Sequence, residues 1–453
     1  MMSGVTESRL RALLVREEDT FRRKHPESTR LFERAKKSLL GGVPMPWMTE
    51  WAGPHPVFLK EARGARVQDV DGHIYVDFCL GDTGAMTGHS PRAVVDALIR
   101  QAQKGITAML PVEDAIWVAE ELGRRFGVPS WQFALTATDA NRFVLRIARE
   151  ITRRPKVLVF NWCYHGTVDE TFITLRDGVP VLRKGSVGPP VDPVLTTKVI
   201  EWNDVDALEE ALSPRDVACV LAEPAMTNIG IILPEPGYHQ ALREVTRRYG
   251  TLLVIDETHT ICAGPGGYTA AYGLQPDFVT IGKPIAGGVP AAAYGFTEEV
   301  ASSIMRRKSD ILDSSDTGGI GGTLSGNALS IAAMRATLSE VLTDQAFEHM
   351  IALAKRFEEG VQGVISATKA PWHVVRLGCR VEYRFQPNVP KNGGEAAAWI
   401  NPELDRFMHL YALNRGILLT PFHNMALMSP VTTEEDVDLH TRVFREAAEE
   451  LLA

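Results

Sequence analysis

Short apolar runs alternate with amphipathic stretches between about residue 90 and residue 283. Apolar residues recur at helical spacing over residues 91–104, 113–126 and 140–153. Strands separated by helices are typical of a mostly parallel sheet with crossover helices. The pattern therefore predicts an α/β fold for this part of the chain. The runs read as strands are KVLVF (156–160), VACVLAE (217–223), TLLVIDE (251–257) and FVTIGK (278–283).

The two ends of the chain follow a different pattern. The first 40 residues predict two helices, which end at GGVPMP (41–46) because glycine and proline do not continue a helix. Residues 57–80 alternate as strands around an Asp71-Gly72 turn signal. The C-terminal part of the chain resembles a separate α+β domain. After Thr323 we expect helices over 326–342, 345–365, 401–415 and 433–452, a strand over 373–385 and an irregular or extended segment over 417–430.

Composition narrows the class of protein. The chain has 453 residues with 48 basic and 56 acidic side chains, a net charge of −8. This balance disfavours a nucleic-acid partner, which needs a basic face. The N-terminus is too charged for a signal peptide, and no apolar run approaches the roughly 18 residues of a membrane span. The five cysteines are scattered without a CxxC pair, so we expect reduced thiols, no metal site and a cytoplasmic location.

Polar residues follow four of the apolar runs, and ligands bind beyond the carboxyl ends of strands in open α/β sheets. These residues are Asn161, Glu223, Asp256 and Lys283. A desolvated lysine at a strand end is a usable amine nucleophile, although it can equally be a surface lysine. Asp256 ends a fully apolar strand, where a carboxylate is costly unless it meets a cation or caps a helix.

Two further segments carry candidate chemistry. Thr136, Ala137 and Thr138 precede a helix, where hydroxyl and backbone N–H groups can cradle a phosphate or form an ordinary helix cap. Tyr164 and His165 follow another strand, where an aromatic ring can stack on a flat ligand or pack in the core. Together with a lysine and a carboxylate, these features match the requirements of pyridoxal phosphate (PLP).

The order of these motifs resembles that of class III aminotransferases of PLP fold type I, most closely the glutamate-1-semialdehyde 2,1-aminomutase-like branch. The resemblance covers nearly the whole chain. It implies a large domain with a mostly parallel seven-stranded sheet and a small α+β domain. The segments that carry it are DVDGHIYVDF (69–78), GHSPRAVVDAL (88–98), EPAMTNIGIILPEPGYHQALREVTRRYGTLLVIDE (223–257) and GGTLSGNALSIAA (321–333).

The resemblance also implies roles for individual residues. Lys283 would form a Schiff base with PLP and shuttle a proton, Asp256 would keep the pyridine nitrogen protonated, and Tyr164 would stack on the ring. Thr323 would reach the phosphate of a neighbouring subunit, which implies a homodimer with shared active sites, either alone or paired into a tetramer. The implied cofactor contacts are Thr136, Ala137, Thr138, Tyr164, His165, Glu223, Asn228, Asp256, Thr258, Lys283 and Thr323. The implied domains are residues 1–80 (part of the small domain), 81–335 (the large PLP-binding domain) and 336–453 (the C-terminal small domain).

Departures from the family pattern bear on the substrate. The usual Asp-Glu-Val reads Asp256-Glu257-Thr258 and is followed by His259. Residues 41–51 and 418–430, where relatives place arginines for a substrate carboxylate, contain none. We therefore expect an aminotransferase that moves an amino group from a primary amine or a non-α amino compound to a keto acid or aldehyde. The substrate candidates are Trp47, Met48, Glu223, Arg380 and His423, with Arg384 as an alternative to Arg380.

Three other functions remain open. An intramolecular aminomutase of the glutamate-1-semialdehyde type would need no external keto acid. A β-amino acid aminotransferase would use a carboxylate-bearing amine. A catalytically silent protein of the same fold is disfavoured by the presence of both Lys283 and Asp256.

Overall fold

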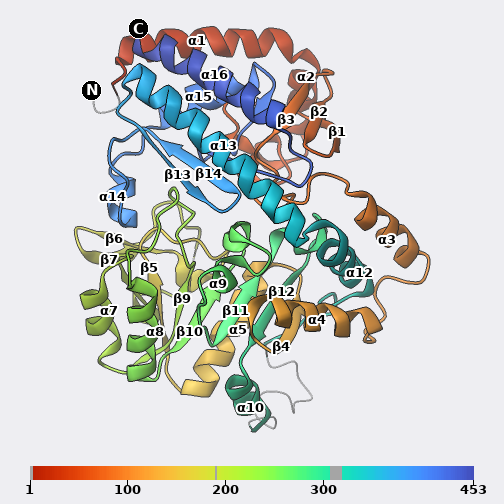
Figure 1. Cartoon of the computed structure of the whole chain (residues 1–453), viewed down its shortest axis with the longest axis vertical. Coiled ribbons are helices and arrows are strands. Elements are labelled where there is room, and N and C mark those ends of the chain that lie inside the picture. The colour runs from red at the N-terminus through yellow and green to blue at the C-terminus, as the bar shows by residue number, and fades with distance from the viewer. Residues whose placement is uncertain (1–3, 189–190, 307–318) are drawn as a thin grey trace. The chain divides into compact units, whose positions relative to one another are not determined.

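The computed structural model describes residues 4–188, 191–306 and 319–453 (Figure 1). Two compact units make up the chain, and each is described by itself. Unit 1 comprises Met1–Pro91, Gln345–Val389 and Trp399–Ala453, and unit 2 comprises Arg92–Asp344 and Pro390–Ala398. The domain boundaries expected from the sequence, after residues 80 and 335, remain a prediction.

A seven-stranded sheet forms the centre of unit 2, with the strand order β4-β12-β11-β10-β9-β5-β8. The pairings from β8 through β5, β9 and β10 to β11 are parallel, and β12 runs antiparallel to both of its neighbours. The mostly parallel seven-stranded sheet is therefore confirmed. Its strands are β4 (Ser130–Ala134), β5 (Lys156–Phe160), β8 (Thr197–Ile200), β9 (Val217–Ala222), β10 (Leu252–Asp256), β11 (Phe278–Ile281) and β12 (Ala292–Phe296).

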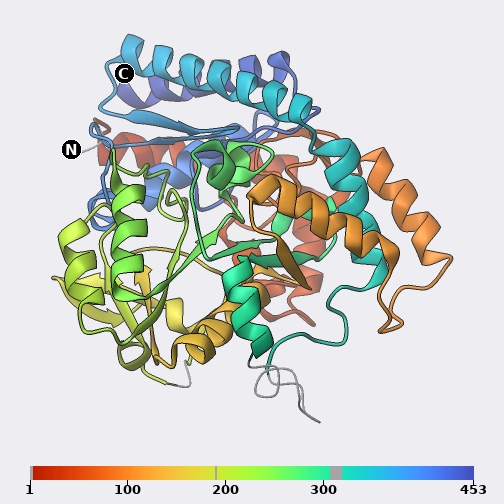
Figure 2. The same ribbon diagram turned by 60° about the horizontal axis from the view of Figure 1, so that its bottom comes forward.

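Helices enclose this sheet, which explains why its strands are apolar without alternation. Every residue of β9 and β11 is buried, as expected for strands covered on both faces. The helix α5 (Ala137–Thr152) packs against β9, β11 and β12, and α8 (Tyr238–Tyr249) packs against β10. Figures 1 and 2 show α7 (Val205–Leu212) beside α8, in agreement with their packing contacts.

Shorter elements complete unit 2. Leu122 and Phe126 of α4 and Ile331 of α12 are buried, so these helices also contribute apolar side chains to the interior. The remaining elements are α3 (Arg92–Ala102), α4 (Glu113–Phe126), η3 (Asp169–Thr171), β6 (Ile173–Arg176), β7 (Val179–Leu182), α6 (Pro193–Thr196), η4 (Thr260–Ala263), α9 (Gly267–Ala271), η5 (Lys283–Ala286), α10 (Glu298–Arg306), α12 (Ala328–Ala336), η6 (Thr337–Val341) and α14 (Gly393–Ala397).

Unit 1 combines two small sheets with long helices. One sheet has the order β1-β2-β3-β15 and the other the order β13-β14-β16. The helix α13 runs alongside α16 in both views, and Arg356 of α13 forms an ion pair with Asp438 of α16 at 2.8 Å. The elements are α1 (Glu7–Lys24), α2 (Pro26–Ala35), η1 (Leu40–Gly42), η2 (Pro46–Glu50), β1 (Leu59–Arg63), β2 (Arg66–Asp69), β3 (Ile74–Asp77), α13 (Asp344–Thr368), β13 (His373–Leu377), β14 (Arg380–Arg384), α15 (Pro402–Leu413), β15 (Ile417–Leu418), β16 (Met425–Leu427) and α16 (Glu434–Leu452).

Several element boundaries differ from those expected. The single strand expected over 373–385 is a hairpin, because Gly378 adopts a positive φ of 57° between β13 and β14. The helix expected over 326–342 is α-helical only over Ala328–Ala336 and continues as the π-helix η6. The strand β12, which the sequence analysis did not single out, is an alanine-rich run that lacks the valines and isoleucines typical of strands. No described helix is both long and apolar enough to span a bilayer.

Candidate active site

Four parallel strands of unit 2 end at the same edge of the sheet. Asn161 directly follows β5, and Glu223 directly follows β9. Asp256 is the last residue of β10, and Lys283 lies two residues after the end of β11. Because the four strands are parallel and adjacent in the sheet, their carboxyl ends bring these residues to one edge. The convergence expected from the strand ends is therefore present.

Asp256 is a buried carboxylate at this edge, with only 3% of its surface exposed. Its Oδ2 atom accepts a hydrogen bond from Asn141 Nδ2 at 2.9 Å and lies 2.9 Å from His165 Nδ1. Its Oδ1 atom accepts a hydrogen bond from the backbone N–H of Thr258 at 3.0 Å. Three separate segments therefore hold this carboxylate in one orientation.

The environment keeps Asp256 and His165 charged. Burial alone would raise the pKa of Asp256, but the hydrogen bond and charge of His165, together with Thr258 and Asn141, lower it to about 2. Burial would likewise lower the pKa of His165, but Cys163 and Asp256 raise it to about 10. Asp256 is therefore an anion at neutral pH and can stabilise a cation brought next to it.

Lys283 occupies a constrained position at the start of η5. Its φ of 50° lies in the left-handed region, which is costly for a residue with a side chain and which clusters at functional sites. The preceding Gly282 lies against the start of α5, where a Cβ would come within 3.1 Å of the Ala137 Cβ atom. The Lys283 Nζ atom lies 2.8 Å from Nε2 of His259, which belongs to the loop after β10.

The start of α5 has the geometry of an anion site. Thr136 is the N-cap residue, and its hydroxyl accepts a hydrogen bond from the backbone N–H of Asp139 at 3.1 Å. Ala137 and Thr138 are the first two helical residues, whose N–H groups precede the first intrahelical bond. Gly166 packs on this turn so closely that a Cβ would lie 2.1 Å from the Thr138 Oγ1 atom. The Thr136 hydroxyl therefore caps the helix, and the backbone supplies the open donors.

The other predicted cofactor contacts in unit 2 lie on loops that follow β5, β9 and β10. Glu223 is buried and accepts a hydrogen bond from the hydroxyl of Thr227. Asn228 donates a hydrogen bond to the carbonyl of Trp162 at 2.8 Å, which ties the loop after β9 to the loop after β5. Tyr164 is half-buried in the loop after β5. Thr258 is buried next to Asp256, as described above.

Thr323 has a different setting from these residues. It is exposed and lines a groove of about 490 Å³ together with Ile106, Met109 and Leu110. Two of these side chains, Met109 and Leu110, are more than half exposed to solvent. An apolar groove of this kind on unit 2 suits coverage by another protein surface.

The predicted substrate residues of unit 1 fall into one neighbourhood. Trp47 packs edge-on against Phe422 at 5.8 Å between ring centroids, and His423 Nδ1 lies 3.3 Å from Glu382 Oε1. Met48 shares the turn η2 with Trp47, and both are partly exposed.

Arg380 belongs to the same neighbourhood, but its setting weakens its candidacy. It is fully buried and lies 3.5 Å from Glu382, with which it forms an ion pair. Arg384 is half-buried. Because Arg380 is buried and already paired with Glu382, it is a poor candidate for binding a substrate carboxylate. Arg384 remains the alternative.

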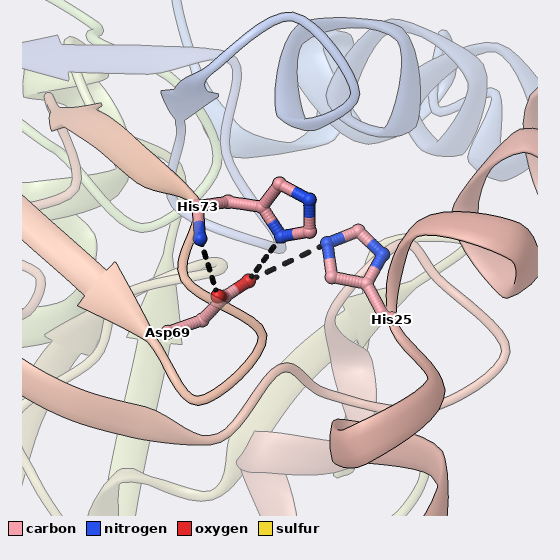
Figure 3. A group of neighbouring side chains, drawn as sticks. All are labelled: His25, Asp69 and His73. Carbon is pink, nitrogen blue, oxygen red and sulfur yellow. Dashed lines mark hydrogen bonds and ion pairs between the residues drawn. The ribbon is translucent and has the colours of Figure 1, made fainter.

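A second polar cluster in unit 1 has the composition of a metal site (Figure 3). Potential ligand atoms of His25, Asp69 and His73 all lie within 4.8 Å of one another. Hydrogen bonds already connect them: His25 Nε2 lies 2.8 Å from the Tyr75 hydroxyl, which donates to Asp69 Oδ2 at 2.6 Å. His25 Nδ1 lies 2.8 Å from the carbonyl of Phe21 at the end of α1. We interpret the cluster as a network that joins the α1–α2 junction to the β2–β3 hairpin.

Two residues of the site were not predicted from the sequence. Asn141 connects Asp256 with Thr280 on β11: its Nδ2 donates to Asp256, and its Oδ1 accepts a hydrogen bond from the Thr280 hydroxyl at 2.7 Å. His259 contacts Lys283, although the sequence showed it only as a departure from the family pattern. A signal was available for Asn141, since a buried polar residue one turn into an apolar helix face needs a partner.

Comparison with known proteins agrees with this geometry. The sequence profile of the aminotransferase class-III family matches residues 47–447. The chain belongs to this family. A glutamate-1-semialdehyde 2,1-aminomutase of Sorangium cellulosum is 33% identical over 432 residues, which cover 93% of this chain and 96% of that protein.

Solved structures extend the comparison. A crystal structure of a glutamate-1-semialdehyde-aminomutase from Pseudomonas aeruginosa PAO1 matches with a TM-score of 0.97 and 50% identity, over 99% of this chain and 100% of that chain. A variant of that protein was solved in complex with PMP. An omega-transaminase from Sphaerobacter thermophilus matches with a TM-score of 0.85 and 27% identity, over 94% of this chain and 98% of that chain.

Proposed function

We propose that the protein is a PLP-dependent enzyme that moves an amino group within one molecule, as a 2,1-aminomutase of the glutamate-1-semialdehyde type. The observation that carries the proposal is that an amine, Lys283, and a buried anion, Asp256, lie at the same edge of the sheet in a chain of this family. The similarity to the P. aeruginosa aminomutase over nearly the whole chain supports the intramolecular reaction.

The donor set of unit 2 fits PLP. Lys283 offers an amine, Asp256 offers a carboxylate that is ionised at neutral pH, and the start of α5 offers N–H groups to a phosphate. The close packing of Gly166 against Thr138 and of Gly282 against Ala137 keeps side chains away from that turn. When bound, PLP supplies an electron sink that stabilises negative charge on the carbon next to the amino group.

The chain's own residues would hold the group and handle protons. Lys283 Nζ would carry the cofactor and then move a proton between carbons. Asp256, held by His165 and Asn141, would keep a proton on the pyridine nitrogen, because a buried anion stabilises a neighbouring cation. Tyr164 would cover one face of the ring, and Glu223, Asn228, Thr258 and Thr136 would frame its edges.

A direct assay tests the intramolecular reaction. The purified protein with PLP is given glutamate-1-semialdehyde and no external keto acid, and NMR follows the isomer with the amino group on C1. We expect isomerisation in the wild type and none in Lys283→Ala, with Lys60→Ala, an exposed lysine of unit 1, as the matched control. Wild-type protein that holds PLP on Lys283 but requires an added keto acid would contradict the aminomutase.

A second function is favoured by one specific observation. No arginine occurs in residues 41–51 or 418–430, so a substrate carboxylate lacks its usual partner there. This favours an aminotransferase for a primary amine without a carboxylate, with Trp47, Met48 and His423 as pocket residues. A panel of such amines with pyruvate and 2-oxoglutarate as acceptors tests it, and absence of turnover with every amine would exclude it.

The groove around Thr323 bears on assembly. We propose that a second copy of the chain covers it and that Thr323 of each copy reaches the phosphate site of the other, in a homodimer. We also propose a cytoplasmic location, with the burial of all five cysteines outside any disulfide as support. Sedimentation of the wild type and of Leu110→Asp tests the dimer, since a charge in the covered groove should favour the monomer.

A further inference from the structure

The contact between Lys283 and His259 is the feature of unit 2 that the proposed roles leave unexplained. Nζ and Nε2 lie 2.8 Å apart, which is a good hydrogen-bond distance. The two residues come from neighbouring parallel strands, because His259 lies three residues after the end of β10 and Lys283 two residues after the end of β11. Both side chains are half-buried. The sheet therefore fixes the pair in place.

We propose that His259 is the proton partner of Lys283 and exchanges a proton with its amine during amino transfer. The inference deepens the proposed function and rests on it. It adds a residue that accepts the proton of Lys283 when the amine must act as a base or nucleophile, and that returns the proton afterwards.

The chemistry of the two groups carries the argument. A lysine ammonium has three donors and no acceptor, whereas a neutral imidazole has one nitrogen with a lone pair. When Lys283 is an ammonium, it donates to the lone pair of His259 Nε2. When the Nζ–H bond breaks and an Nε2–H bond forms, the electron pair stays on Nζ, and the imidazolium donates back to the amine. One contact thus serves both protonation states, and only the proton moves.

Neighbouring charged groups in unit 2 have partners of their own. Asp256 is paired with His165. Glu257 accepts hydrogen bonds from the Thr260 hydroxyl and from the N–H groups of Tyr268 and Thr269 on α9, and burial raises its pKa. On the elements packed against η4 and η5, the other titratable side chains are Cys262, Tyr268, Arg335, which is paired with Asp114, and the exposed Glu340.

The first test uses the cofactor-free protein and measures no activity. NMR of isotope-labelled histidine gives the pH midpoint of the His259 resonance, assigned with His259→Gln. A protonated His259 beside the Lys283 ammonium is a like-charge pair, so replacing the lysine by methionine should raise this midpoint by about one pH unit or more. An identical midpoint in wild type and Lys283→Met would overturn the proposal.

The second test uses the PLP-bound protein and two substitutions. His259→Gln keeps a hydrogen bond to Nζ but cannot carry a proton, and His259→Leu removes both. We expect both variants to keep the cofactor on Lys283, as shown by borohydride reduction and mass spectrometry, and to transfer the amino group about 100-fold more slowly. The acid limb of the wild-type pH–rate profile should disappear in both.

The controls separate the possible failures. His349→Gln changes an exposed histidine of unit 1, whose Nε2 lies 2.9 Å from the Thr432 carbonyl, and should leave rate and pH profile unchanged. A wild-type rate and profile in His259→Gln would reduce His259 to a hydrogen-bond partner and overturn the proton transfer. Wild-type protein that attaches no PLP to Lys283 would defeat the proposed function, whereas the NMR coupling is measured without the cofactor.

Discussion

Two fully buried histidines, one in each unit, have opposite ionisation. His165 of unit 2 faces the carboxylate of Asp256 at 2.9 Å, and its pKa is raised to about 10. His440 of unit 1 is surrounded by the rings of Phe78, Phe357 and Tyr383, and burial lowers its pKa to about 3. Burial is the same for both, so the partner decides the charge. A cofactor site needs a charged pair such as His165 with Asp256, whereas an apolar core needs a neutral histidine such as His440.

The largest expected effect comes from removing the partner of His165. Asp256→Ala would leave a buried imidazolium without its anion, so we expect a loss of about 3–5 kcal/mol in the free energy of unfolding. His165 should then titrate below pH 6.5, as His440 does. Urea unfolding of the variant and histidine NMR measure the two effects. The double variant Asp256→Ala/His165→Leu should recover much of the loss, and a loss below 1 kcal/mol in the single variant would contradict the comparison.

The same pair predicts a pH window. Because the folded-state pKa of His165 is raised, its contribution is fully present below pH 6.5 and declines as the pH rises through about 10. Because the pKa of Asp256 is depressed, its contribution is present above pH 4 and is lost as the pH falls through about 2. We therefore expect the stability difference between wild type and Asp256→Asn/His165→Gln to be largest between pH 4 and 6.5. Urea midpoints at a series of pH values measure it, and a flat difference would contradict the pairing.

His440 should show the opposite dependence. Its folded-state pKa is depressed, so its neutral form is stable above pH 6.5 and stability is lost as the pH falls toward 3. At pH 5 the cost is about 2 kcal/mol, from 1.5 pH units at about 1.4 kcal/mol each. His440→Phe should therefore gain about 2 kcal/mol relative to wild type between pH 7 and pH 5. Thermal midpoints at the two pH values measure this gain, with His349→Phe as the control that should show none.

The network around His25 is intermediate between the charged His165 and the neutral His440, and here we expect the smallest change in stability. Burial lowers the pKa of His25 although Asp69 lies nearby, and the Tyr75 hydroxyl stands between them. Tyr75→Phe removes this hydroxyl, so Asp69 Oδ2 loses a donor and His25 Nε2 loses its hydrogen-bond partner, at a cost of about 1 kcal/mol. Urea unfolding with and without added Zn²⁺ measures the cost. Stabilisation of the wild type by Zn²⁺ would show that the cluster binds a metal instead.

Much of unit 2 was predictable from local pattern. The runs at β5, β9, β10 and β11 are continuous and apolar, and the turn from Gly282 to Lys283 follows directly from the last of them. The strand β12 was not predictable in this way, because alanines contribute little to the apolar periodicity. The hairpin at Gly378 was missed for a related reason: its two strands are short, and only Gly378 and Cys379 separate them.

The site was predictable where chemistry is carried by one residue type in a fixed order, as with Lys283 and Asp256. It was less predictable where function depends on partners distant in sequence. Asn141 reaches Asp256 across 115 positions, and His165 reaches it across 91. Arg380 was predicted to bind substrate because the sequence does not show whether a carboxylate already neutralises an arginine in a strand. In the structure, Glu382 does so.

The amino-acid sequence by itself determined most of the helices, the four apolar strands at the site, the family and the two residues most central to the proposed chemistry, because these depend on periodicity and on residue type. Only the tertiary structure decided which buried groups are charged. The pKa of a buried side chain depends on the partner within a few ångströms, and the pairs His165 with Asp256 and His259 with Lys283 arise from the way that parallel strands bring distant loops to one edge.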